Sequence, residues 1–500
     1  SIKYKIMEAM DRKLPGSIDY SAVLPMSVPA MSRRRKFYPV NGGSFSSQGN
    51  SEIRIQISSQ NALLDPAHSY LDFSVTNSNA VAEFSPDTGG AAMFFSRLRI
   101  EQAGVVLSDT QEYNRLVASV LNPVSETGGG RLAGTIRDGT QAGNTTGPNN
   151  IVPFVAGVRR GDRLALSDHG GGVRVAAGAT QRFSMPLITG LFTQDKLIPL
   201  PLIDGNNPLT IILTMDDVVN MGLYAPPAAI PTASSMVISG ISYAAQLVEV
   251  GSDVISQFGM MRDMMGGQLA LSGHDWEHNS ETLPGGAAGG GGERIINIPM
   301  RKRSIKSLFW VANSNDIANV VTGGFPAVSL SEMYNKSFGG TCNMSSYQLK
   351  VGSVVYPPTP IQGPGDSALA VSQTRRGECL QELAKAMGTL SFTAPTGRCL
   401  NTLTYCADIA SQVGPTTASG DNGGAGAAFI AIGNEPAYCS AFGIDLESFQ
   451  HTALESGIDT ESLALQTNLI ISVDPLAGTI GAEDKTIHSW LCYDKHYYFN

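Results

Sequence analysis

Hydrophobic and polar residues alternate along much of the chain with the period of a β-strand. Ile53, Ile55 and Ile57 are separated by polar residues, the pattern of a strand with one buried face. Short runs rich in β-branched and aromatic residues follow, and Gly, Pro, Asn and Asp separate them. These runs span residues 69–77, 94–102, 182–188, 209–216 and 241–250. This spacing predicts an antiparallel β-sandwich.

One segment with a helical period interrupts the strands. Asp109 and Glu112 have the spacing of a capping box, and Pro123 follows the segment. Between them the apolar residues recur at i, i+3, i+4, i+7 and i+8, which predicts a short amphipathic helix. These residues are Tyr113, Leu116, Val117, Val120 and Leu121.

The order of strand landmarks repeats in the second half of the chain. Each single match is weak because apolar strands resemble one another, but the matches keep the same order and a similar displacement. A helix near 378–387 also follows the second copy of the third landmark, as it does in the first half. The matching segments are 52–57 with 293–298, 75–79 with 311–315, 98–107 with 349–356, and 211–216 with 469–474.

The repeat predicts an all-β chain made of two tandem sandwiches of ordinary domain size. We expect the first over 51–258 and the second over 293–500, joined by a Met- and Gly-rich flexible connector over 259–292. Each copy carries a long insertion rich in Gly, Thr, Asn and Pro, at 125–150 and at 394–426. We expect both insertions to be loops that project from one end of their sandwich.

The first 50 residues predict an arm rather than a domain. An apolar residue recurs every fourth position among cations, which predicts an amphipathic helix ended by Pro15. A run of four cations follows the arm helix. Contact with nucleic-acid phosphates or lipid headgroups and a solvated, salt-bridged turn are equally good explanations of this run. The candidate contact residues are Ile2, Ile6, Met10 and Leu14 in the helix and Arg33, Arg34, Arg35 and Lys36 in the cationic run.

Composition narrows the functional classes. The 500 residues include 34 Lys and Arg against 43 Asp and Glu, a net charge of −9, which argues against nucleic-acid binding over the whole surface. The six cysteines form no C-x-x-C pair, so we expect reduced thiols and neither a zinc site nor any other cofactor. The N-terminal residues lack the apolar core of a signal peptide, and we expect the protein to stay inside the cell that makes it.

One segment matches a catalytic motif. His274, Glu277 and His278 fit the H-x-x-E-H zinc-hydrolase pattern, which requires a helix, but Gly273 and Pro284 flank them and no apolar stripe supports a helix. We therefore expect a polar loop, with a metal-dependent hydrolase as a minor alternative. No G-x-S-x-G elbow or Gly-Lys dipeptide occurs, and we expect no enzymatic activity.

The C-terminal residues are aromatic and alternate with the period of a strand. A sugar-stacking face is one explanation, and a core strand that closes the second sandwich is the better one, because the alternation fits a strand with one buried face. The aromatic residues are Trp490, Tyr493, Tyr497, Tyr498 and Phe499.

The chain as a whole resembles double jelly-roll major capsid proteins, closest to those of polinton-like viruses, virophages and related double-stranded DNA viruses of eukaryotes. The likeness rests on the strand 347–352 that leads into Tyr356-Pro357-Pro358-Thr359-Pro360-Ile361, and on the final strand 493–498. The resemblance implies two eight-stranded jelly rolls with short inserted helices and an N-terminal arm.

The resemblance also implies a role and partners. The chain would form homotrimeric, pseudo-hexameric capsomers that tile an icosahedral virion shell, with penton and minor capsid proteins as further partners. The arm would lie inside, against an inner membrane or the genome. A tandem β-sandwich that binds carbohydrate, or a virion spike, is the alternative that the long loops and C-terminal aromatics leave open.

Overall fold

The computed structural model describes twenty stretches of the chain. They are 30–80, 83–86, 90–121, 175–192, 196–203, 208–225, 236–264, 266–267, 269–283, 292–314, 344–363, 378–379, 381–383, 385–386, 431–432, 435–436, 441–448, 456–461, 466–473 and 485–499. The long insertions at 125–150 and 394–426 lie outside these residues.

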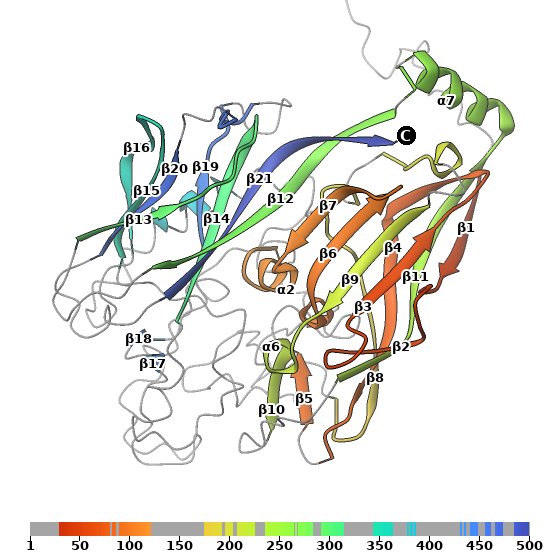
Figure 1. The fold of residues 1–500 in the computed structure, drawn as a ribbon, viewed down its shortest axis with the longest axis horizontal. Helices are drawn as coiled ribbons and strands as arrows, with labels where there is room; N and C mark the ends of the chain where they lie inside the picture. Colours follow the sequence, from red (N-terminus) through yellow and green to blue (C-terminus); the bar gives the residue numbers. More distant parts are fainter. Residues whose placement is uncertain are drawn as a thin grey trace, which may run out of the picture.

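The first half forms a sandwich of two antiparallel sheets (Figure 1). One sheet has the order β1-β11-β4-β8, with β2 paired to β11, and the other has the order β3-β9-β6-β7. The strands of the first sheet are β1 (Ala30–Phe37), β2 (Ser44–Ser46), β4 (Ala62–Asn77), β8 (Thr180–Met185) and β11 (Met236–Val250). Those of the second are β3 (Glu52–Ile57), β6 (Phe95–Gln102), β7 (Val105–Gln111) and β9 (Leu209–Met215).

The second half repeats this architecture. Its sheets have the orders β12-β21-β14-β19 and β13-β20-β15-β16. The strands of the first are β12 (Leu269–Leu283), β14 (Ile305–Ser314), β19 (Phe442–Asp445) and β21 (Lys485–Phe499). Those of the second are β13 (Gly292–Asn297), β15 (Met344–Val351), β16 (Val354–Gln362) and β20 (Thr467–Val473).

The strand orders of the two halves correspond position by position. In each half the first strand pairs with the last, β1 with β11 and β12 with β21, and the pair β3–β9 corresponds to the pair β13–β20. Every repeated sequence landmark falls on corresponding strands: β3 with β13, β4 with β14, the β6–β7 hairpin with β15–β16, and β9 with β20. The prediction of two tandem eight-stranded jelly rolls is therefore confirmed.

Shorter elements connect the strands. Two small two-stranded sheets pair β5 (Glu83–Pro86) with β10 (Gly222–Ala225) and β17 (Ala431–Ile432) with β18 (Glu435–Pro436). The helical elements are η1 (Gly90–Phe94), α2 (Tyr113–Leu116), η2 (Val117–Leu121), η4 (Leu200–Leu202), α6 (Val218–Met221) and α7 (Ser252–Met264). No helix in the described part of the chain is long and apolar enough to cross a membrane.

The helix predicted at 113–121 is present, but its start differs from the prediction. Glu112 adopts a left-handed conformation with φ of 50°, and its side chain makes no capping hydrogen bond. Asp109 instead accepts two hydrogen bonds from the guanidinium of Arg97, at 2.7 and 2.5 Å. The cross-strand ion pair between β6 and β7 thus takes the carboxylate that the sequence pattern assigned to a capping box.

The connector expected over 259–292 is largely regular structure. Residues up to Met264 belong to α7, and β12 occupies Leu269–Leu283. β12 pairs with β21 along its whole length, from Leu269 opposite Phe499 to Leu283 opposite Lys485. The expectation of a flexible connector is wrong for these residues, because the sheet needs a first strand to cover the edge of β21. β1 plays the same role at the edge of β11, inside the range expected to be an arm.

Each sandwich has an aromatic centre. In the first, the ring of Phe73 lies 5.4 to 6.0 Å from those of Phe94, Phe95 and Phe183, measured between ring centroids. In the second, the rings of Trp310 and Phe442 stack at 4.3 Å. All of these side chains are essentially inaccessible to solvent, so they supply much of the apolar surface that folding buries.

We expect Phe73→Ala to lower the free energy of unfolding by about 3 to 5 kcal/mol, because the surrounding rings cannot collapse into the space left behind. Urea denaturation followed by circular dichroism measures the loss. Tyr38→Ala is the control, since that side chain is 63% exposed, and it should change stability by less than about 0.5 kcal/mol. Equal effects of the two substitutions would contradict the assignment of Phe73 to the core.

Candidate assembly surfaces and the contact between the sandwiches

The cationic run lies on β1, the outer strand of its sheet. Pairing with β11 places Arg33 and Arg35 opposite Leu247 and Ala245, two members of the apolar core. Because successive strand residues point to opposite faces, Arg34 and Lys36 lie on the outer face of the sheet. The four cations are therefore divided between two faces and do not form one charged surface.

Most of these cations contact groups of the same sandwich. Arg33 lies 3.4 Å from the carboxylate of Glu249. The guanidinium of Arg34 lies 5.1 Å from the ring centroid of Tyr70, and that of Arg35 lies 5.0 Å from the ring of Phe37. Charged side chains on an outer strand also discourage pairing with other sheets. Arg33 is therefore salt-bridged, as one of the two explanations of the run expected, but it lies in a strand and not in a turn. Contact of the cationic run with phosphates stays a prediction.

Lys36 belongs to a polar cluster around the buried Asp72 of β4. The Asp72 carboxylate, 4% exposed, accepts hydrogen bonds from Lys36 Nζ at 2.8 Å, from Arg182 Nε at 2.8 Å and from Ser184 Oγ at 3.2 Å. A second hydrogen bond comes from the other guanidinium nitrogen of Arg182. The Arg182 hydrogen bonds, with the help of Lys36, hold the pKa of Asp72 well below its usual range despite burial.

The other predicted contact residues, Ile2, Ile6, Met10 and Leu14, lie outside the described residues. Their junction with the fold is nevertheless defined. β1 begins at Ala30, which pairs with Val250, two residues before the start of α7 at Ser252. The arm therefore leaves the sandwich next to α7.

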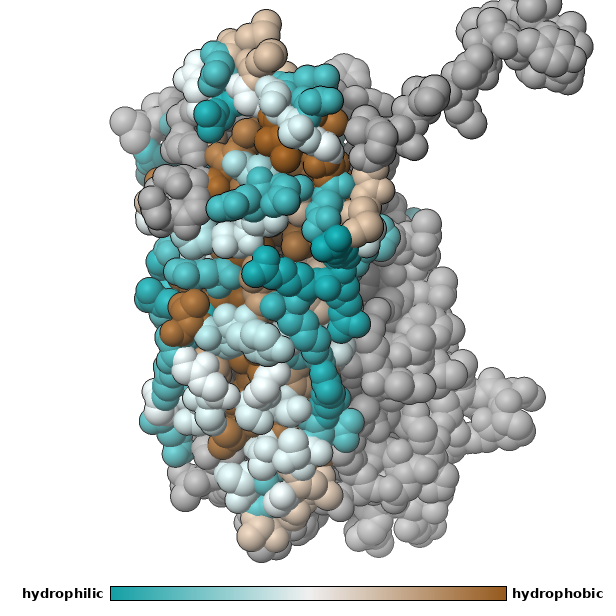
Figure 2. Space-filling model, turned by 90° about the vertical axis from the view of Figure 1, so that its right-hand side faces the viewer, coloured by the Kyte–Doolittle hydropathy of each residue, from teal (hydrophilic) through white to brown (hydrophobic). Residues whose placement is uncertain are grey.

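α7 lies at the upper end of the right-hand side of the molecule in Figure 1. None of its residues is buried, and Met260, Met261 and Met264 are 65%, 46% and 87% exposed. Figure 2 shows this face, with hydrophilic side chains across its middle and hydrophobic ones nearer the end at which α7 lies. The sequence signalled these methionines only as part of an expected connector, because their helical placement depends on the strands at either side.

The two sandwiches meet through buried polar contacts as well as apolar packing. Asp275 of β12, whose side chain is 1% exposed, accepts a hydrogen bond of 2.7 Å from Ser108 of β7 in the first sandwich. Its other oxygen lies 2.7 Å from Lys495 Nζ and accepts a hydrogen bond from Tyr493 at 3.4 Å. One carboxylate thus joins a strand of the first sandwich to two residues of β21.

Backbone contact is closest at Gly190. A Cβ atom placed on this residue would lie 1.1 Å from the carbonyl oxygen of His274, which also accepts a hydrogen bond of 2.7 Å from the hydroxyl of Tyr497. Only glycine leaves room for this approach. The distance between the loop after β8 and strand β12 is therefore fixed by the absence of a side chain.

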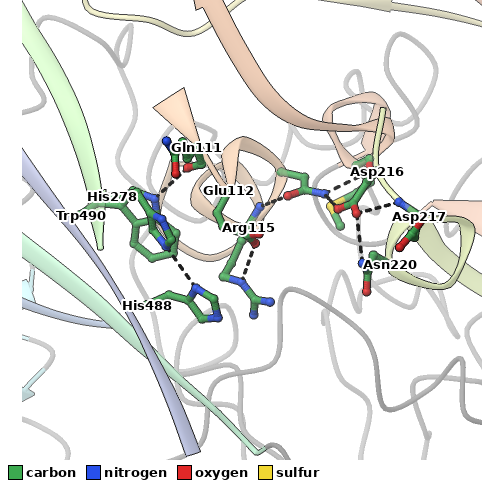
Figure 3. A network of polar contacts seen from close by, with 11 residues as sticks. Gln111, Glu112, Arg115, Asp216, Asp217, Asn220, His278, His488 and Trp490 are labelled. Carbon is green, nitrogen blue, oxygen red and sulfur yellow. Dashed lines mark hydrogen bonds and ion pairs between the residues drawn. The ribbon is translucent and has the colours of Figure 1, made fainter. Parts of the chain in front are cut away.

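The junction between β7 and α2 forms a third contact, drawn in Figure 3. The indole nitrogen of Trp490 donates a hydrogen bond of 3.3 Å to the carbonyl oxygen of Gln111, and the rings of His278 and His488 stack beside the indole with Nε2 and Nδ1 3.1 Å apart. On the other side of the helix, Asn114 donates to Asp216 at 2.5 Å. A polar network therefore runs from β21 through α2 to the end of β9.

The H-x-x-E-H segment is a strand, not the polar loop expected. Residues four apart in a strand lie about 13 Å from each other, too far for two imidazoles to share one metal ion. His274 lies 3.1 Å from Asp494, whereas His278 contacts His488. The described residues contain no group of His, Cys, Asp and Glu able to hold a metal.

Further ionisable groups are buried in the second sandwich. Lys306, 5% exposed, lies 2.8 Å from Glu447 and 3.4 Å from Asp494. Burial alone would lower the pKa of Lys306, but these two carboxylates together raise it. Burial raises the pKa of the Cys492 thiol, which keeps it neutral and unreactive.

The C-terminal aromatics are mostly core residues, as expected of a closing strand. Trp490, Tyr497 and Phe499 are at most 1% exposed, and Tyr493 is 8% exposed. Burial raises the pKa of Tyr497 well above its ordinary value. Of these five aromatic residues only Tyr498 is largely exposed, at 50%. The strand therefore does not present a continuous aromatic surface to a sugar.

Comparison with known proteins identifies the fold. The major capsid protein of Faustovirus matches with a TM-score of 0.58 at 10% identity, covering 99% of this chain and 94% of that one. VP54 of PBCV-1, fitted into a reconstruction of the virophage Sputnik, matches with a TM-score of 0.56 at 10% identity, covering 96% and 97%. No family model matches the sequence, and no curated protein matches it.

The chain has the double jelly-roll fold of these capsid proteins. A third structure, the quasi-atomic model of the PBCV-1 capsid, agrees with a TM-score of 0.52 at 9% identity over 95% of this chain and 96% of that one. The matches run from one end of the fold to the other, so they include both sandwiches. The resemblance stated from the sequence is confirmed at the level of the fold.

We expect Asp72→Asn to destabilise the protein most above about pH 4, the ordinary aspartate value. The depressed pKa of Asp72 means that its contribution is complete above that pH and is lost as the pH falls toward the folded-state pKa. Thermal unfolding of both proteins between pH 7 and pH 2 should therefore give melting temperatures that converge on acidification. Asp263→Asn, at a side chain 75% exposed, should leave the profile unchanged, and a pH-independent gap for Asp72→Asn would contradict this account.

We expect Ser108→Ala to lower the free energy of unfolding by about 1.5 to 3 kcal/mol, because it removes a hydrogen bond to a buried carboxylate. Chemical denaturation measures the change. Ser256→Ala is the matched control, since Ser256 Oγ donates only to the Ser252 carbonyl on exposed α7. If both variants unfold at the same denaturant concentration, the Ser108–Asp275 contact does not hold the sandwiches together.

Proposed function

We propose that this protein is the major capsid protein of an icosahedral double-stranded DNA virus, a structural subunit of the virion without catalytic activity. The observation that carries the proposal is the match of both sandwiches, over 99% of the chain, to the Faustovirus major capsid protein. Shared fold at 10% identity supports the architecture, and the function follows by analogy.

The architecture suits a homotrimer with a pseudo-hexagonal outline. Two jelly rolls of the same strand order stand side by side in one chain, so three chains supply six similar walls. The polar and apolar contact around Asp275 and Trp490 fixes the angle between them. A rigid angle is a requirement for walls that pack against neighbouring capsomers.

The domain boundaries that we propose follow the sheets. The first jelly roll extends over 30–250 and the second over 269–499, with α7 between them. Both ranges begin earlier than the sequence pattern indicated, because β1 and β12 belong to the sheets. Residues 1–29 then form the arm.

We assign the arm to the interior of the shell. Its apolar residues Ile2, Ile6, Met10 and Leu14, and the exposed cations Arg34 and Arg35 at its base, would contact an inner membrane or the genome. Neighbouring capsomers, penton proteins and minor capsid proteins are the remaining partners in this proposal.

We expect the purified protein to form a stable trimer of about 158 kDa from three chains of 52.7 kDa. Light scattering gives the mass, and negative-stain images of the same peak should show a hexagonal outline. A folded monomer at high concentration would contradict the capsid proposal. Saturable binding in a glycan array by that monomer would favour the carbohydrate-binding alternative.

A further inference from the structure

α7 presents an apolar surface that nothing in the described part of the chain covers. Val254, Ile255 and Phe258 on one side of the helix are half-buried, and α7 contacts η4. At about 100° per residue, Met260 and Met264 fall on the opposite side. Met260 and Met264, with exposures of 65% and 87%, lie about one turn apart there, and Met261, 46% exposed, lies at the border with the half-buried side. These flexible apolar side chains form a surface of the kind that receives helices.

We propose that, in the protein outside the shell, this surface of α7 binds the N-terminal segment 1–14 of the same chain, as an amphipathic helix that lies along α7. Inside a shell, a membrane or the genome would compete with α7 for the same apolar stripe. The contact lies within one chain and does not depend on the capsid function. Its apolar partners would be the stripe that contains Ile6 and Met10 on one side and the methionines of α7 on the other.

The path of the chain favours this occupant. Ala30 pairs with Val250, and α7 begins at Ser252, so the arm enters the fold beside the first turn of α7. Residues 15–29 can span up to about 50 Å when extended, whereas α7 is about 20 Å long. Segment 1–14 therefore reaches every part of α7, and its tether gives an effective concentration on the order of millimolar.

Charge complementarity agrees with the path. Segment 1–14 carries four cations and two carboxylates, whereas α7 carries Asp253 and Asp263 against one cation, Arg262. Asp253 falls on the same side of α7 as Met260 and Met264, and Lys13 falls on the same side of the arm helix as Ile2 and Ile6. Each of the two apolar surfaces therefore includes one charged residue, Lys13 on the arm helix and Asp253 on α7, and the two charges have opposite sign.

Methionine oxidation tests the contact on the full-length protein. In the wild type, hydrogen peroxide should oxidise the three α7 methionines slowly, as measured by mass spectrometry. The variant Ile6→Asp/Met10→Asp should raise their rates about tenfold, the change expected if the helix is covered in about nine molecules of ten. The control Lys5→Gln/Arg12→Gln changes the polar side of the arm and should match the wild type.

Two outcomes would overturn the proposal. One is equal oxidation of α7 in the wild type and the Ile6→Asp/Met10→Asp variant, with Met93, which is 0% exposed, unoxidised in both as a sign of an intact fold. The other comes from the double variant Met10→Cys/Met260→Cys under mild oxidation. A disulfide between the two introduced cysteines within one chain is expected, identified by mass spectrometry of the linked peptides in the single-chain band of a non-reducing denaturing gel. The same linked peptides in a two-chain band would mean that the arm binds a neighbouring copy.

Discussion

The pairing of each closing strand with the first strand of its half is the interaction on which the rest of the fold depends. β11 and β21 are both fifteen residues long, and each lies between the first strand and a central strand of its sheet. Without β11 the sheet β1-β11-β4-β8 would be interrupted, and without β21 so would the sheet β12-β21-β14-β19. Each core would then lose one of the two sheets that cover it. The pairing joins residues about two hundred positions apart, and long-range contacts of this kind form slowly because the intervening chain must be ordered first.

The seam between the jelly rolls combines apolar and ionic contacts that have different consequences. Trp276, Phe309 and Trp490 belong to the same apolar core as the residues of the first sandwich, so burial supplies attraction without direction. Asp275 supplies direction, because its two oxygens are satisfied only when β7 and β21 lie in the observed arrangement. Buried charge of this type adds little net stability, but a misaligned pair is costly. The seam is therefore specific in angle as well as favourable in energy.

Much of this fold was predictable from the sequence, and the reasons are physical. Strands with one buried face alternate with period two, so Ile53, Ile55 and Ile57 were assigned correctly, and the order of repeats located corresponding strands in both halves. β1 escaped the prediction because an outer strand with six exposed residues has no apolar alternation to detect. β12 escaped it because His274 and Asp275 are buried polar residues that owe their position to partners far along the chain.

The candidate contact surfaces were less predictable. A run of cations such as Arg33 to Lys36 suggests one charged surface, but in a strand alternate side chains lie on opposite faces. In addition, Lys36 forms an ion pair with Asp72. The exposed side of α7 could not be anticipated either, because exposure depends on which side of a helix the rest of the fold leaves bare. Sequence patterns record local periodicity well and record three-dimensional neighbours poorly.

The position of β21 has a consequence for the order in which the protein is made. β21 occupies residues 485–499 and lies between β12 and β14 in the second jelly roll. During synthesis the first jelly roll can close once β11 has emerged, whereas the second cannot close until β21 has emerged as well. A prematurely terminated chain therefore carries one finished wall and one open sheet, which excludes it from any assembly that needs both walls. The second wall therefore depends on β21, the last of its strands to be made.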